Sequence, residues 1–208
     1  MFRDRIDAGR LLALKLRKVV NGKDFVVAGI TRGGVVIAKK IADYFKFPLF
    51  PLVVKKLSPP NNSEFAIGAI GPKKTVYWDK DYVRRFKISR KYREGAVKNK
   101  SKEVERLEKL LRSEKKSPDF KNKKVIVVDD GVATGATVIC ASKFLKKEKA
   151  ELIILATPVI AQDSFSYIKK YFDMVIALKK SRDFSSVGQF YVNFGQVENK
   201  EVIKILGN

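Results

Sequence analysis

The segment 125–137 constrains this chain most, because an apolar strand pattern, two adjacent acids and a glycine–threonine loop follow one another there. Four β-branched residues at positions 125–128 lead into Asp129 and Asp130, and this pattern predicts a buried parallel strand. Apolar residues at helical spacing resume after Thr137. The loop therefore falls at the carboxyl end of a strand, where open α/β sheets bind ligands.

The residue types in this loop suit a phosphorylated sugar. Gly131 and Gly135 allow tight turns and close approach of a ligand, while Thr134 and Thr137 offer hydroxyl groups. The backbone N–H groups at the start of the following helix favour an anion such as a phosphate. The two carboxylates can accept hydrogen bonds from vicinal hydroxyl groups, so the pattern indicates a site for a sugar phosphate.

The run 125–137 resembles the phosphoribosyl-pyrophosphate (PRPP) motif of type I phosphoribosyltransferases, an apolar strand followed by two acids and a T-G-x-T loop. The resemblance implies that Asp129 and Asp130 hold the ribose hydroxyls and stabilise positive charge at the anomeric carbon. It implies Mg²⁺ as the cofactor, which these two acids meet mostly indirectly, through PRPP. It also implies substrate contacts, with the 5-phosphate at positions 134–137, from Gly131, Val132, Ala133, Thr134, Gly135, Ala136 and Thr137.

Ala133 stands where hypoxanthine-guanine enzymes of this family carry an Asp near the purine ring. Adenine and uracil enzymes also carry Ala at this place, so the motif is intact. The base-recognition scheme of the hypoxanthine-guanine enzymes therefore does not transfer to this chain.

Two shorter segments resemble the pyrophosphate-binding parts of the same family. Thr31, Arg32 and Gly33 follow the first predicted strand, where a guanidinium group and bare backbone N–H groups could reach pyrophosphate. Lys55 and Lys56 close the second predicted strand, with a solvated strand end as the alternative. Lys56 is preferred, because only one of two successive strand residues can point into a site.

The acceptor side of the site has weaker candidates. Phe184 and Tyr191 lie in a tail that loosely resembles the base-binding hood of purine enzymes, with core packing as the alternative to stacking on a base. Glu64 lies in the segment 58–70, which takes the place of the family's mobile loop. It is a candidate to orient an acceptor or a metal, with an ordinary surface hairpin residue as the alternative.

Apolar patterns along the chain alternate between strand and helix, which predicts an α/β fold with a doubly wound, mainly parallel sheet. The predicted strands cover residues 25–30, 48–54, 125–129, 151–157 and 174–178. The predicted helices cover residues 6–20, 35–45, 135–147, 161–172 and 198–206. We expect a single domain over 1–208, with an inserted flap hairpin and basic helix over 58–118. A small hood is expected from 181–208 with the N-terminal segment.

Composition excludes several classes of function. The chain has no histidine, which removes Ser-His-Asp hydrolysis and the common histidine metal sites. Its single cysteine, Cys140, allows no internal disulfide. The longest apolar stretch, 152–161, is too short to span a bilayer, and no signal segment is seen, so we expect a cytoplasmic protein without membrane contact.

The formal net charge of +22 has three interpretations: nucleic-acid binding, a solvated lysine-rich surface, or a polyanionic substrate. The excess is concentrated in residues 84–124, where 17 Lys and Arg face 6 Asp and Glu. Apolar residues at helical spacing there predict a largely amphipathic helix. Glutamates interleave with the basic residues, which favours a solvated face, so we expect no nucleic-acid partner.

The expected reaction is transfer of ribose 5-phosphate from PRPP to a nitrogen acceptor, a nucleobase or an amine, with release of pyrophosphate. One alternative is a non-catalytic regulator that senses PRPP or a nucleotide and binds nucleic acid through its basic surface. Hydrolysis, with water as the acceptor, is another. The identity of the acceptor and the oligomeric state stay open, with a homodimer among the possibilities.

Overall fold

The computed structural model describes residues 1–60, 62, 65–112 and 119–207. Its centre is a five-stranded sheet in which every neighbouring pair is parallel, in the order β2-β1-β6-β7-β8. The strands are β1 (Phe25–Ile30), β2 (Leu49–Leu52), β6 (Lys124–Val128), β7 (Leu152–Ala161) and β8 (Met174–Ser181). The predicted mainly parallel α/β fold is confirmed. The strand order reverses between β1 and β6, and ligands bind at such a switch point.

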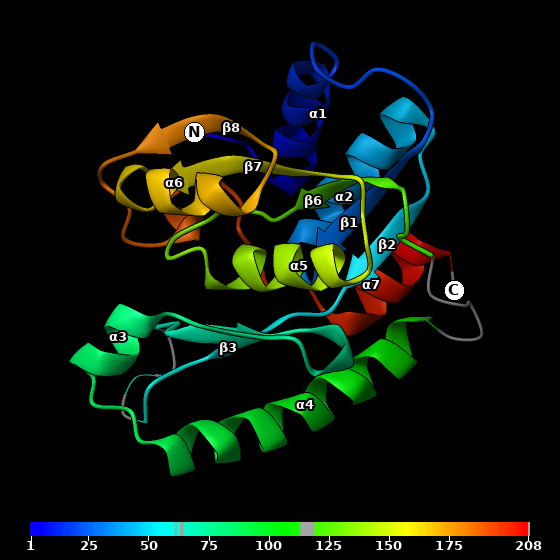
Figure 1. Cartoon of the computed structure of the whole chain (residues 1–208). Coiled ribbons are helices and arrows are strands. Elements are labelled where there is room, and N and C mark those ends of the chain that lie inside the picture. Colours follow the sequence, from blue (N-terminus) through cyan, green and yellow to red (C-terminus); the bar gives the residue numbers. More distant parts are fainter. Residues whose placement is uncertain (61, 63–64, 113–118, 208) are drawn as a thin grey trace.

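Helices cover both faces of this sheet (Figure 1). On one face lie α1 (Arg5–Leu16) and α2 (Gly33–Phe45), where Leu12 and Ile37 pack with Ile126 of the sheet. On the other face lie α5 (Ala136–Lys147) and α6 (Gln162–Ile168), where Ile139 packs with Val125. A 3-10 turn (Lys169–Tyr171) continues α6. Successive sheet residues alternate between the two cores, as a pleated strand buried on both faces requires.

The inserted segment adds two further layers beyond α5 (Figure 1). A small antiparallel sheet, in the order β3-β4-β5, is built from β3 (Lys55–Leu57), β4 (Gly68–Ile70) and β5 (Val76–Trp78), with a 3-10 turn (Pro72–Lys74) before β5. Then come α3 (Lys80–Arg85) and the long α4 (Arg90–Arg112), which packs on the far side of the small sheet.

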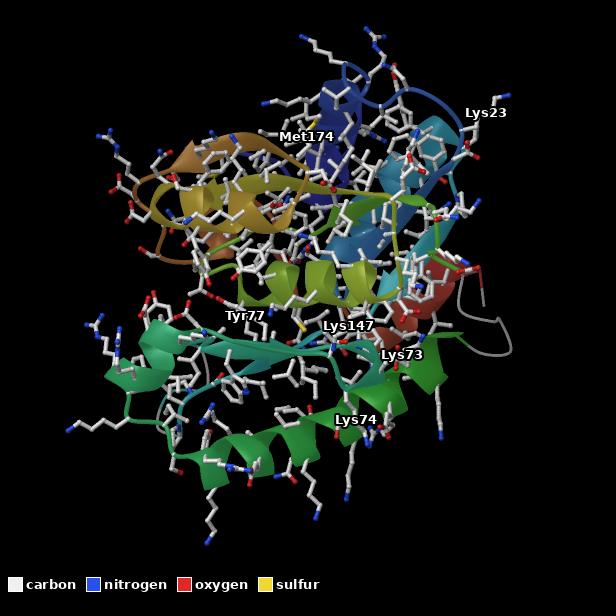
Figure 2. The ribbon with its side chains drawn as sticks, viewed as in Figure 1. Lys23, Lys73, Lys74, Tyr77, Lys147 and Met174 are labelled. Carbon is white, nitrogen blue, oxygen red and sulfur yellow. The ribbon has the colours of Figure 1, made fainter. Side chains whose placement is uncertain are left out.

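Polar contacts tie the small sheet to the main body. Tyr77 lies between the small sheet and the layers above it (Figure 2), and its hydroxyl is 3.1 Å from the hydroxyl of Tyr167. The thiol of Cys140 on α5 is 3.3 Å from the carbonyl oxygen of Thr75, to which it donates. Burial raises the pKa of the Cys140 thiol to about 12. The inserted segment is therefore fixed against α5.

The N-terminal segment pairs with residues that follow β8, beside the main sheet. Phe2 forms a parallel bridge with Tyr191, and the N–H of Phe2 donates to the carbonyl oxygen of Phe190 at 2.8 Å. A 3-10 turn (Val187–Phe190) precedes this bridge, and α7 (Asn199–Leu206) packs through Val202 near Leu107 of α4.

Several element bounds differ from those predicted. The helix α1 ends at Leu16 instead of residue 20, and β7 continues to Ala161 instead of ending at 157. Lys55 and Lys56 do not close the second strand: the chain leaves the main sheet after Leu52, and these two residues begin β3 of the small sheet. Within the part of the chain that the structure describes, no helix is long and apolar enough to cross a membrane.

Candidate active site

A cleft of about 1560 Å³ opens at the carboxyl edge of the main sheet. One wall is made by the loops that follow β1, β6, β7 and β8, and the other by β3 and the first half of α4. Ligand sites commonly enclose roughly 300–1,000 Å³, so this cleft has room for more than one small molecule.

Asp129 lies at the end of β6, on the wall of the cleft. Its Oδ1 accepts the backbone N–H of Asp130 at 3.0 Å, and the Thr137 hydroxyl donates to its Oδ2 at 3.4 Å. Burial raises the pKa of Asp129 to about 8, and the charge of Asp130 adds to this effect. The ammonium group of Lys56 acts in the opposite direction. Burial and the neighbouring carboxylate therefore both disfavour the charged form of Asp129.

Asp130 forms a salt bridge with Arg5. The Nε of Arg5 donates to its Oδ2 at 2.8 Å, and the two side chains are only 11% and 16% exposed. Arg5 also donates to the carbonyl oxygen of Gly195 at 2.8 Å, and it lies 3.9 Å from the centre of the Phe194 ring. The Tyr191 hydroxyl donates to the Asp130 carbonyl oxygen at 2.6 Å. Arg5 near the N-terminus and residues 191–195 thus hold Asp130 in place.

The loop 131–137 wraps the start of α5. Gly135 caps the helix in the left-handed region, with φ +80°, where glycine is favoured. Thr134, Gly135 and Thr137 line the cleft, as do Gly131 and Ala133. The predicted contacts Val132 and Ala136 are placed differently. Both side chains are buried, and the N–H and C=O of Val132 bond to β7 at Val159 and Ala161.

The loop after β1 brings Thr31, Arg32 and Gly33 to the cleft. The peptide bond between Thr31 and Arg32 is cis. Among the described residues, the buried Thr31 hydroxyl has no hydrogen-bond partner, and a buried polar group of this kind needs one. A Cβ added to Gly33 would lie 1.9 Å from Asp130 Oδ2, so this loop and the acids are in direct contact.

Lys55 and Lys56 both line the cleft, although the prediction allowed only one of them to do so. The cleft is broad and has several walls, so two successive residues of β3 can both reach it. Lys56 interacts with Asp129, as described above. Lys55 is half-buried, and burial lowers its pKa.

The two aromatic candidates, Phe184 and Tyr191, have different surroundings in the structure. Phe184 lines the cleft and also packs on Phe190, with ring centres 5.1 Å apart. Tyr191 is 5% exposed, and its hydroxyl is bonded to Asp130, so it is a core residue and not a stacking surface. Glu64 lies outside the described residues.

The sequence profile of the phosphoribosyl transferase domain matches residues 3–194. The chain belongs to the phosphoribosyltransferase family. Two Mycobacterium tuberculosis proteins, from strains CDC 1551 / Oshkosh and H37Rv, are each 34% identical to it over 206 residues. Both bear the name "Putative phosphoribosyl transferase". The match covers 99% of this chain but 46% of each relative, so the chain spans about half the length of these curated relatives.

Solved structures share the fold of this chain. The crystal structure of TT1426 from Thermus thermophilus superposes with a TM-score of 0.82 and 32% identity, and covers 99% of this chain and 97% of that one. A purine phosphoribosyltransferase from Pyrococcus horikoshii has a TM-score of 0.50, 18% identity and 93% coverage of both chains. At this lower identity the likeness concerns the fold alone. The resemblance to type I phosphoribosyltransferases inferred from the sequence is confirmed.

Sequence reasoning missed two groups of residues that line this phosphoribosyltransferase cleft. One is Arg5, which lies 125 residues from its partner Asp130. The other is one face of α4, which supplies Lys91, Tyr92, Gly95, Ala96, Asn99, Lys100 and Glu103. The spacing within α4 predicts an amphipathic helix, but it does not show which face meets the cleft.

The donor set suits a magnesium ion that arrives with a polyphosphate. Within the described residues, no group of three or more His, Cys, Asp or Glu side chains could hold a metal by itself. Magnesium usually binds through one or two carboxylates and substrate phosphates, and it keeps several waters. Asp129 and Asp130 match that pattern, since both line the cleft.

Proposed function

We propose that this protein transfers ribose 5-phosphate from PRPP to a nitrogen acceptor, a nucleobase or an amine, with release of pyrophosphate. The supporting observation is that one cleft brings together the two acids, the 131–137 loop and the 31–33 loop at the sheet's switch point. A ligand with a phosphate at one end, a diol in the middle and a diphosphate at the other end matches this order of groups.

Each part of the cleft has a role in this proposal. Thr134, Gly135 and Thr137 hold the 5-phosphate at the N-terminus of α5, where backbone N–H groups and the helix dipole favour an anion. Asp129 and Asp130 accept hydrogen bonds from the ribose hydroxyls. The negative charge of Asp130, and that of Asp129 when it is ionised, stabilises the anomeric carbon as it becomes oxocarbenium-like.

The leaving group lies toward the loop after β1. Thr31, Arg32 and Gly33 bind the diphosphate together with Lys56, through charge-assisted hydrogen bonds and backbone N–H groups. Asp129 and Asp130 would hold Mg²⁺ mostly indirectly, through PRPP, and the ion would supply positive charge to balance the charge that collects on the pyrophosphate. As the carbon–oxygen bond breaks, its electron pair leaves with pyrophosphate, and the acceptor nitrogen forms the new bond.

The acceptor side is formed by the hood and the inserted segment. Phe184 offers a ring face at the cleft for a planar acceptor. The inserted flap hairpin and basic helix over 58–118 belong to a single catalytic unit over 1–208, in which the hairpin excludes water from the reactive carbon.

The proposal is tested by mixing the protein with PRPP, Mg²⁺ and a panel of nucleobases and amines, and measuring pyrophosphate release. Asp130→Asn should lower turnover by roughly 10²–10³, the scale of one lost electrostatic contact in a transition state. Asp119→Asn, at an exposed position away from the cleft, is the matched control and should leave turnover unchanged.

Equal turnover of the Asp130→Asn variant and the wild type would contradict the role of the acid. PRPP binding without turnover on any acceptor, with affinity alone altered in the variant, would point to a sensor of PRPP. Pyrophosphate release without an acceptor would point to hydrolysis.

A further inference from the structure

The long helix α4 presents a continuous stripe to the cleft that the roles above leave unused. The stripe consists of Lys91, Tyr92, Gly95, Ala96, Asn99, Lys100 and Glu103. Steps of three and four residues place these side chains on one helical face. The Tyr92 hydroxyl donates to the carbonyl oxygen of Ser58 at 2.9 Å, which ties the stripe to the segment after β3.

Three cations meet where this stripe faces β3 and the loop after β1. Burial lowers the pKa of Lys55, and the positive charges of Arg32 and Lys100 lower it further, while Glu103 acts in the opposite direction. Arg32, Lys55 and Lys100 all line the cleft. Like charges held close together in a partly dehydrated place are unfavourable unless an anion joins them. The cluster therefore has the charge and the position of an anion-binding site.

The geometry at Lys100 leaves it able to bind such a ligand. Its Nζ donates to Oε1 of Glu103 at 2.7 Å, and the two side chains are 40% and 48% exposed. An ammonium group has three donors, so this bond leaves two for another acceptor. On the opposite wall, Arg32 lies 3.9 Å from Oε2 of Glu198, so it too is only loosely held by a carboxylate.

We propose that Lys100 of α4 is a binding residue for the diphosphate group of the donor, acting from the wall opposite Arg32. This inference rests on the proposed function. In the proposed function the 5-phosphate binds at 134–137. The diphosphate is therefore the anion left to bind between Arg32 on one wall and Lys100 on the other. Its binding links the inserted segment to the main sheet, and Lys100 stabilises the charge that the leaving group gains.

Calorimetry with inorganic pyrophosphate, PRPP and ribose 5-phosphate, each with Mg²⁺, tests this assignment. Lys100→Gln should weaken binding of pyrophosphate and PRPP by roughly tenfold or more, the scale of one lost charge-assisted hydrogen bond, and leave ribose 5-phosphate unaffected. Lys98→Gln is the matched control, because Lys98 is exposed on the same helix and does not line the cleft. It should change none of the three affinities.

Two further variants keep the test independent of any effect on the helix. Lys100→Arg retains the charge and should recover most of the pyrophosphate affinity. Lys55→Gln, on β3, should show the same selective loss as Lys100→Gln. Circular dichroism of each variant establishes that the helices are retained.

The assignment is overturned if Lys100→Gln binds pyrophosphate as tightly as the wild type. It is also overturned if Lys98→Gln shows the same loss, or if ribose 5-phosphate weakens equally, because the effect is then one of general charge. If the wild type turns over PRPP and the Lys100→Gln variant does so equally well, this inference fails while the proposed function stands. Lys100-dependent pyrophosphate binding without turnover leaves the site standing and removes the proposed transferase reaction.

Discussion

Asp129 and Asp130 are neighbours in sequence, yet the structure gives them opposite surroundings. Asp130 has the guanidinium group of Arg5 at 2.8 Å. Asp129 has a single weak hydroxyl contact and one backbone N–H, and burial raises its pKa to about 8. A carboxyl whose pKa is raised by its surroundings, as that of Asp129 is, is typical of catalytic sites.

The raised pKa of Asp129 predicts a stability change that depends on pH. Its carboxyl binds a proton more readily in the folded protein than in the unfolded chain, where the ordinary value is 3.8. The stability it contributes is therefore complete below that value, and it is lost as pH rises toward about 8. Asp129→Asn should raise the melting temperature, with a larger gain at pH 8 than at pH 5. A gain of about 1 kcal/mol corresponds to roughly 2–4 °C in a chain of this size.

The matched variant Asp130→Asn should lower the melting temperature. Asp130→Asn leaves the largely buried Arg5 without its carboxylate, and such an uncompensated charge destabilises a fold. Thermal melts of both variants between pH 5 and pH 8.5 make the comparison. A melting temperature of Asp129→Asn below that of the wild type at pH 8 would contradict the assigned surroundings of Asp129.

At the scale of elements, local pattern predicted the strands well where burial is continuous. The strand β1 was predicted with its observed bounds, Phe25–Ile30, because six successive residues are buried on both faces. The predicted strand 151–157 stops before Pro158, whereas β7 continues to Ala161. A proline removes only one ladder donor, and pairing with β8 resumes at Val159 and continues to Ala161.

Features that depend on how distant elements pack could not be predicted from the local sequence pattern. Val19 and Val20 continue the apolar spacing of α1 after the helix has ended at Leu16, because they pack in a turn that buries the same side. The motif loops at 31–33 and 129–137 could be placed at one edge because parallel strands share that edge. The position of α4 across the cleft depends on how the inserted sheet packs on α5, and spacing within α4 does not show this.

The glycine inside α4 predicts a second stability change. An added Cβ at Gly95 would meet no atom within 4 Å, although glycine lowers the stability of a helix interior relative to alanine. Gly95→Ala should therefore raise the free energy of unfolding by roughly 0.5–1 kcal/mol. Urea denaturation measures this change.

Gly34, at the start of α2, is the matched control for this substitution. Its added Cβ would lie 2.5 Å from the carbonyl oxygen of Val128, so Gly34→Ala should lower the free energy of unfolding. A loss of stability in Gly95→Ala would show that α4 is not a regular helix at that position.

At the scale of the whole molecule, the donor should bind the folded protein and stabilise it. A ligand at 100 times its dissociation constant adds about 2.7 kcal/mol, which corresponds to a rise of roughly 5–11 °C in melting temperature here. We expect this rise with PRPP and Mg²⁺. It should shrink when a chelator removes the metal, because Asp129 and Asp130 line the cleft and the ion offsets their repulsion of the diphosphate. The absence of any shift at millimolar PRPP would refute donor binding.

The net charge of +22 makes nucleic acid the obvious competing partner. Figure 2 shows many nitrogen-tipped side chains projecting from the outer side of α4 into solvent. Some of them are paired along the helix, as Arg90 is with Glu94 at 2.7 Å. The sequence of α4 holds one aromatic residue, Tyr92, and its hydroxyl is bonded to Ser58, so no row of rings is available to stack on bases.

We therefore expect no complex with RNA or DNA tighter than the roughly 10⁻⁶ M of non-specific binding at physiological salt. Low salt does not discriminate, because a lysine-rich surface attracts any polyanion when screening is weak. The decisive comparison is wild type against Lys98→Glu with Lys102→Glu, two exposed positions on α4 that do not line the cleft. Fluorescence anisotropy with labelled oligonucleotides across a salt series measures it. A sub-micromolar complex at physiological salt that this charge reversal abolishes would favour a nucleic-acid-binding regulator. Weak binding that disappears with rising salt would leave the basic face of α4 as a solvated surface.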